Sequence, residues 1–244
     1  MRLKSALKTA SELYAQRYSD AAVVLLAGSV VRGEATEHSD LDLIVVYEVV
    51  EQARRESFHY DSWPVEAFIH DPKTLDYFFR KVDSPSGVPS LPDMVASGVE
   101  VSEPNETSNK IKILARSILD EGPPVWTDDD KVNSRYKITD MIDDIRSPRS
   151  VHELRATLMY LYPAISDHFF RSKGNWSAKG KSIPRKLAAI DPQFAEQFTA
   201  AFDAALTTGD TKELIQLSAA LLEPDGGFYF DGDSRLAPKN WRSE

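Results

Sequence analysis

Hydrophobic and polar positions in the first half of the chain switch between helical and strand spacing. Residues 3–18 place apolar side chains at intervals of three or four, which predicts an amphipathic helix. Short runs of apolar, β-branched and aromatic residues then predict strands, with further helical segments between and after them. The predicted strands are 21–27, 39–47, 57–60 and 64–70, the predicted helices are 30–35, 73–82, 93–97 and 106–121, and 84–93 is a predicted loop rich in proline and serine.

The pattern changes after Gly122, where two prolines interrupt the chain. Every periodic segment beyond them has helical spacing, over 128–145, 150–172, 182–189, 193–206 and 211–222. The turn-rich segment after 222 has no period, and we expect only the packing of its aromatic residues to order it. The chain is therefore expected to have an α+β fold, with a mixed sheet and flanking helices over 1–122 and an all-α helical bundle over 123–244.

Composition narrows the class of partner. The 244 residues carry 38 acidic and 29 basic side chains, and the net charge of −9 opposes binding to nucleic acid and to anionic membranes. The chain has no cysteine, which excludes disulfides and thiolate metal sites. Its start lacks the apolar core of a signal peptide, and its longest apolar run, 21–27, is too short to span a bilayer. We therefore expect a cytoplasmic protein without a membrane partner.

Asp40 and Asp42 give the first indication of chemistry. Side chains two residues apart in a strand point to the same face, so these carboxylates are expected to converge while Leu41 and Leu43 point into the core. Two adjacent anions repel one another unless a hard cation such as Mg²⁺ lies between them. A solvated strand end is the plain alternative, and neighbouring features must decide between the two.

Two further features accompany this pair. Gly28 and Ser29 end one strand and open a short helix, where backbone N–H groups bind phosphate and glycine allows its close approach. Glu66 lies mid-strand on the face opposite Val65 and Ala67, where a charge needs a partner. A salt bridge would satisfy Glu66 as well as a metal would. Taken together, three carboxylates beside a phosphate-binding turn favour a site for metal and phosphate.

This pattern resembles the polymerase-β-type nucleotidyltransferase superfamily. That family has a Gly-Ser pair, often an Arg-Gly pair, then Ser-Asp-x-Asp-Leu and a third acidic residue on a neighbouring strand. The matching positions here are Gly28, Ser29, Arg32, Gly33, Ser39, Asp40, Asp42 and Glu66. A catalytic α/β lobe followed by a helical lobe is also similar to the antibiotic nucleotidyltransferases, which modify aminoglycosides or lincosamides.

The resemblance implies the chemistry. Asp40 and Asp42 would hold Mg²⁺, and Glu66 would ligate a second ion or act as general base. A hydroxyl of a small-molecule acceptor would attack the α-phosphorus of ATP or another nucleoside triphosphate, so that AMP is transferred and pyrophosphate leaves. Both the attacking and the leaving oxygen develop negative charge, which two cations about 3.5–4 Å apart stabilise.

The nucleotide-binding residues that the resemblance implies lie in both halves. Gly28 and Ser29 would contact the β- and γ-phosphates, with Ser39 nearby, and Arg32 would either bind phosphate or make a structural salt bridge. The helical half has a basic cluster at Arg171, Lys173, Lys179, Lys181 and Arg185. Antibiotic-modifying relatives use basic residues of this lobe on the triphosphate, which points to Lys181 and Arg185 and to an acceptor in the cleft between the lobes. A solvated basic loop is the alternative.

Other functions stay open. Small members of the superfamily act as antitoxins that attach AMP to a protein partner, although this chain carries a helical lobe of its own. A non-catalytic nucleotide sensor is a second alternative, but a sensor need not keep Glu66. An enzyme that extends tRNA or DNA is disfavoured by the net charge and by the lack of a long basic stripe.

Overall fold

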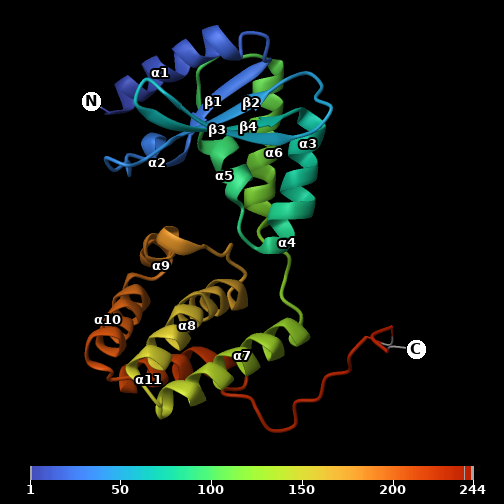
Figure 1. Cartoon of the computed structure of the whole chain (residues 1–244). Coiled ribbons are helices and arrows are strands. Elements are labelled where there is room, and N and C mark those ends of the chain that lie inside the picture. The colour runs from blue at the N-terminus through green and yellow to red at the C-terminus, as the bar shows by residue number, and fades with distance from the viewer. Residues whose placement is uncertain (1, 239, 243–244) are drawn as a thin grey trace. The chain divides into compact units, whose positions relative to one another are not determined.

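The computed structural model describes residues 2–238 and 240–242, which form two compact units, Met1–Pro124 and Val125–Glu244 (Figure 1). The first unit contains a sheet and several helices. Its strands are β1 (Val23–Ala27), β2 (Leu41–Val46), β3 (Arg54–Tyr60), β4 (Trp63–His70) and β5 (Val99–Glu100). Its helices are α1 (Arg2–Arg17), α2 (Gly28–Val31), α3 (Pro72–Tyr77), α4 (Ser84–Ser86), α5 (Ser90–Ser97) and α6 (Glu106–Glu121), with a π-helical segment, η1 (Phe78–Asp83).

The sheet has the strand order β3-β4-β2-β1-β5 and is mixed, because β2 and β4 are parallel and the other pairs are antiparallel. Alternate residues of the central strands point to opposite faces. On one face, Leu41, Leu43 and Val45 are fully buried in a cluster with Ala6 and Leu13 of α1. Helices α5 and α6 lie on the other face (Figure 1). The α+β fold expected from the sequence is confirmed.

Several local predictions for this unit were wrong. The helix expected over 30–35 is α2, which starts at Gly28 because a positive φ of 72° turns the chain directly from β1 into a helical turn. The segment expected as a loop over 84–93 contains α4 and the start of α5. The helix expected over 73–82 changes to π-helical geometry at Phe78. The sequence did not predict strand β5, because a strand of two residues is too short to show alternating apolar and polar positions.

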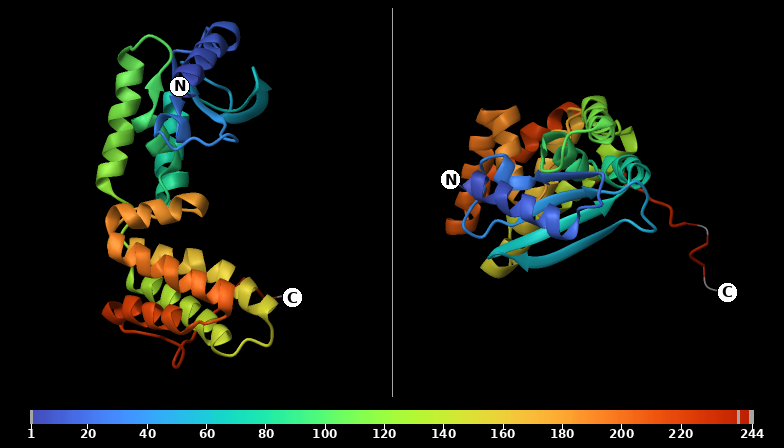
Figure 2. Two further views of the ribbon diagram at one scale, coloured as in Figure 1. Left: turned by 90° about the vertical axis from the view of Figure 1, so that its left-hand side faces the viewer. Right: turned by 90° about the horizontal axis from the view of Figure 1, so that it is seen from above.

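All the regular secondary structure of the second unit is helical in its described residues (Figure 2). It consists of α7 (Asp128–Arg146), α8 (Val151–Ser172), α9 (Ile183–Ile190), α10 (Pro192–Thr208) and α11 (Lys212–Leu222), with the 3₁₀ turns η2 (Gly180–Ser182) and η3 (Glu223–Asp225). Side chains cap three helix starts: Thr127 before α7, Ser150 before α8 and Asp191 before α10. The core includes Phe198 and Phe202, whose rings pack on one another, and Phe169, whose ring meets that of Phe170 edge to face.

The segment after α11 depends on hydrogen bonds as well as on aromatic packing. Arg135 of α7 donates to the carbonyls of Gly226 and Gly227, each over 2.7 Å, and the N–H of Tyr229 donates to the Thr139 hydroxyl over 2.9 Å. Phe230 stacks against a ring on the same helix. The expectation that aromatic packing alone orders this segment was therefore wrong.

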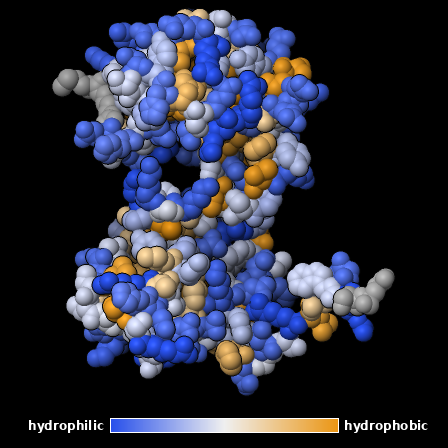
Figure 3. Space-filling model, in the orientation of Figure 1, coloured by the Kyte–Doolittle hydropathy of each residue, from blue (hydrophilic) through white to orange (hydrophobic). Residues whose placement is uncertain are grey.

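The surface is mainly hydrophilic in the view of Figure 3, with separate apolar patches on each unit. None of the helices in the described part of the chain combines the length and the hydropathy needed to cross a bilayer.

Candidate active site

Two neighbouring strands and the residue before one of them carry the three predicted carboxylates. Asp42 of β2 is in register with Glu66 of the parallel strand β4, and on its other side with Ala27 of β1. Since Leu41 and Leu43 pack against α1, Asp42 belongs to the opposite face of the sheet. Asp40 immediately precedes β2, which begins two residues later than its predicted range.

The structure brings Asp40, Asp42 and Glu66 together. Each offers a carboxylate oxygen within 4.8 Å of those of the other two, and each residue is half-buried. Three anions this close repel one another unless a cation lies between them. Hard oxygen ligands with room for water and phosphate suit Mg²⁺, so this donor set fits the metal that the resemblance implied.

Glu66 also has a cationic neighbour. The guanidinium of Arg55 on β3 lies 3.6 Å from its carboxylate, so the salt bridge considered as the alternative exists in part. The Arg55 side chain is 61% exposed, and ion pairs this exposed contribute little to stability. The contact therefore leaves Glu66 available to a metal ion or a substrate proton.

Gly28 shapes the other side of the site. It has a φ of 72°, which favours glycine, and a β-carbon at this position would overlap the Oδ2 atom of Asp42. Ala27, which precedes α2, has no side chain able to cap the first N–H groups of that helix. Ser29 is 8% exposed in the same turn. The glycine thus lets the Asp42 carboxylate lie directly against the backbone of the turn that begins α2.

Arg32 and Ser39 have partners within the first unit. Arg32 lies 3.2 Å from a carboxylate oxygen of Glu34 and 3.5 Å from one of Asp93, so it makes the structural salt bridge that the sequence left open. The Ser39 hydroxyl accepts the N–H of Thr36 over 2.8 Å and so shapes the loop that leads into Asp40. Their contact with a nucleotide stays a prediction.

The basic cluster of the helical unit is more varied than the sequence suggested. Arg171 is 8% exposed, with its guanidinium over the Trp126 ring, and the Lys173 ammonium lies over Phe169. Lys181 in η2 and Arg185 in α9 are exposed. A role for these two residues in nucleotide binding stays a prediction.

Sequence reasoning missed β3 as a source of site residues. The predicted strand began at residue 57, whereas β3 begins at Arg54, and Ser57 is in register with Glu66. Arg55 and Ser57 share one face of the strand, while Glu56 and Phe58 point the other way. Exposed and half-buried residues alternate only from Arg55 onward, and the polar residues Arg54, Arg55 and Glu56 give no alternation of apolar and polar positions that would have predicted the start of this strand.

A family comparison decides the class of the first unit. Residues 4–84 match the family model of the nucleotidyltransferase domain. The chain carries a polymerase-β-type nucleotidyltransferase domain. The matched range contains most of α1, the turn at Gly28 and all three carboxylates. The predicted enzyme class, nucleotidyltransferase, is confirmed.

The comparison with solved structures found similar chains as well. A nucleotidyltransferase-like protein from Exiguobacterium sibiricum 255-15 is similar over 90% of this chain and 73% of its own, with 14% sequence identity and a TM-score of 0.45. No curated protein matches the sequence.

Proposed function

We propose that this nucleotidyltransferase moves AMP from ATP to a hydroxyl of a small-molecule acceptor, with Mg²⁺ bound, and releases pyrophosphate. The observation that carries the proposal is the approach of Asp40, Asp42 and Glu66 to within 4.8 Å on the sheet face next to Gly28. A donor set of this kind serves reactions in which negative charge develops on two oxygens.

The site residues of the first unit each have a role in the proposed reaction. Asp40 and Asp42 hold the metal, and the backbone at Gly28 and Ser29 receives the outer phosphates. Glu66 completes the metal set or accepts the proton of the acceptor hydroxyl. The hydroxyl oxygen forms a bond to the α-phosphorus as the bond to the pyrophosphate oxygen breaks. When bound, Mg²⁺ stabilises the charge on both of these oxygens.

The helical unit supplies the second part of the proposal. Lys181 and Arg185 contact the triphosphate, as basic residues of the helical lobe do in the antibiotic nucleotidyltransferases that the domain order resembles. The net charge of −9 supports a small-molecule acceptor over nucleic acid. The co-substrate and the metal are abundant in the cytoplasm, where we place the protein.

The test uses ATP labelled at the α-phosphate, incubated with the purified protein and a cell lysate. Label recovered on a small molecule supports the proposal. Label on a protein band instead identifies a protein-modifying regulator, and ATP binding without transfer identifies a sensor. Asp42→Asn should reduce pyrophosphate release on the order of 10²-fold or more. The control is Asp61→Asn in the β3–β4 turn, where Asn tolerates the φ of 44°.

A further inference from the structure

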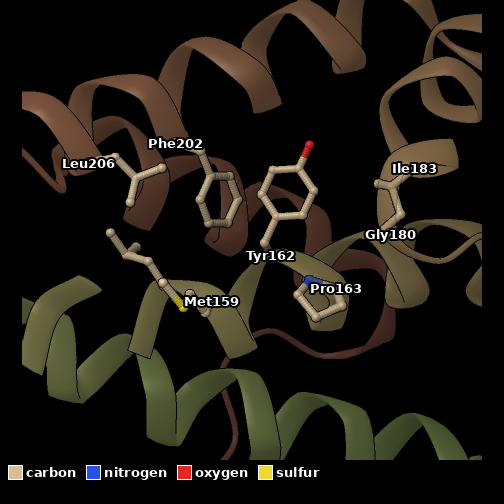
Figure 4. Close-up of a pocket in the computed structure, with 8 residues that line it drawn as sticks. Met159, Tyr162, Pro163, Gly180, Ile183, Phe202 and Leu206 are labelled. Carbon is tan, nitrogen blue, oxygen red and sulfur yellow. The ribbon is translucent and has the colours of Figure 1, made fainter. Parts of the chain in front are cut away.

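A pocket of about 400 Å³ lies within the helical unit, between α8, η2, α9 and α10 (Figure 4). Its walls include Met159, Tyr162 and Pro163 of α8, Ile183 of α9, and Phe202 and Leu206 of α10. Cavities that bind small molecules commonly have volumes of about 300–1,000 Å³ and mostly apolar walls. Its size and lining place this pocket in that class.

The base of the pocket is rigid and apolar. Ile183 and Phe202 are each 2% exposed and belong to the core of the unit. The rings of Tyr162 and Phe202 meet edge to face, with 4.7 Å between their centroids. At the rim, Met159 is 72% exposed and Leu206 is 37% exposed. A preformed apolar base with exposed apolar side chains at its edge favours an apolar ligand.

One hydrogen-bonding group belongs to this apolar wall, the hydroxyl of Tyr162. Burial, and then the carboxylate of Asp203, raise the pKa of Tyr162, so its hydroxyl stays neutral. A neutral hydroxyl in the lining offers an acceptor to a ligand that carries a donor.

The volume and the course of the chain argue against a macromolecular occupant. A stable protein interface buries about 800 Å² on each partner, more than a pocket of this size supplies alone. The segment 226–230 is held on α7 through Arg135 and Thr139, and therefore lies on another helix.

We propose that this pocket, which we call the helical-unit pocket, binds a small, largely apolar molecule that carries one hydrogen-bond donor. The inference does not depend on the proposed function, because none of the pocket residues is among those assigned there to the metal or to the phosphates.

The test is a fluorescence titration of the full chain with N-phenyl-1-naphthylamine, a neutral aromatic probe with one N–H. Adjacent residues of α8 provide a matched pair of variants: Met159 lines the pocket, whereas Tyr160, which is 70% exposed, is absent from its lining. We expect saturable binding that Met159→Arg weakens about tenfold and Tyr160→Arg changes less than about twofold. Leu206→Trp, which fills the rim, should also weaken binding.

All three substituted positions are exposed, and circular dichroism checks that the variants fold.

Three results would overturn the proposal: probe binding that does not saturate, equal effects of Met159→Arg and Tyr160→Arg, or light scattering that shows a dimer dissociated by Met159→Arg. The last result would identify the pocket rim as a contact between two copies of the chain. Asp42→Asn should bind the probe like the wild type, so loss of nucleotidyl transfer and loss of this binding site are separable.

Discussion

The carboxylate of Asp42 occupies the space in which a β-carbon of residue 28 would lie. Gly28 follows Ala27, the last residue of β1, which is in register with Asp42, and the φ of 72° at Gly28 starts α2 at once. A close approach and a positive φ therefore require glycine at the same position.

Gly28→Ala is predicted to abolish the carboxylate site. The new methyl group displaces Asp42, so Mn²⁺ affinity and nucleotidyl transfer should each fall about tenfold or more, by analogy with other changes beside metal ligands. Backbone strain should lower the free energy of unfolding by about 1 kcal/mol. Gly33→Ala is the matched control, because Gly33 has a φ of 74° and nothing near its absent β-carbon. It should lose similar stability in urea but keep Mn²⁺ binding; equal Mn²⁺ affinity in both variants would contradict the prediction.

Glu66→Gln and Glu56→Gln should separate metal binding from stability. Glu66 belongs to the carboxylate group, whereas Glu56 accepts hydrogen bonds from Arg17 over 2.9 Å and Arg54 over 3.0 Å on the other face of β3. Metal at a hundredfold excess over Kd stabilises a folded protein by about 2.7 kcal/mol. We expect Glu66→Gln to lose this gain, with metal-free stability unchanged or higher. Glu56→Gln should keep the gain but lose about 1 kcal/mol without metal. Thermal unfolding with and without Mg²⁺ measures both.

The buried side chain of His70 is expected to make the free energy of unfolding depend on pH. Burial lowers the pKa of His70 to about 4, against a smaller opposing effect of Asp71. Between pH 6.5 and 4 the unfolded chain therefore binds a proton that the folded chain does not, so stability falls as the pH falls through this range. The loss is on the order of 3 kcal/mol, and there should be no contribution from His70 above pH 7.

The pH dependence is checked by urea unfolding of His70→Asn across this range. The slope of stability against pH should become smaller, whatever the absolute stability of the variant. Burial also lowers the pKa of His168, so part of the slope should remain. His59→Asn, at an exposed position on β3, should leave the slope as in the wild type.

Asp225 is predicted to anchor the segment after α11. Its carboxylate accepts a hydrogen bond from Lys131 over 2.9 Å and lies 3.2 Å from Nε2 of the buried His168. Asp225→Asn should therefore lower the free energy of unfolding by about 1–3 kcal/mol. Asp233→Asn is the control, since Asp233 pairs with Arg235 two residues away, and it should cost less than about 1 kcal/mol. If both variants lost a similar free energy of unfolding, the contacts of Asp225 with α7 and α8 would not contribute to stability.

The parts of the fold that sequence alone predicted are those with a strong period. The helix expected over 106–121 matches α6, and the five helices expected after residue 122 correspond to α7 through α11, with ends shifted by at most two residues. In the site, the spacing of Asp40 and Asp42 predicted that these two carboxylates converge, and the resemblance to the nucleotidyltransferases implied that Glu66 joins them.

What the sequence could not predict depends on partners distant along the chain. Nothing local shows that β4 lies parallel to β2 in the register that sets Glu66 beside Asp42, because register follows from packing over the whole sheet. Arg55 was missed for the same reason, since its relation to Glu66 crosses from one strand to the next. The ion pairs of Arg32 required the positions of Glu34 and Asp93, the second of which lies far along the chain.

The register between β2 and β4 has an evolutionary consequence. Backbone hydrogen bonds at the centre of the sheet fix the distance between Asp42 and Glu66, and neither residue is on a mobile connection. Surface loops and the helical unit can therefore accumulate substitutions that change which molecule is modified, while the spacing of the ion-binding groups is inherited intact. In such an architecture, new substrate preferences arise without the catalytic chemistry having to be reinvented.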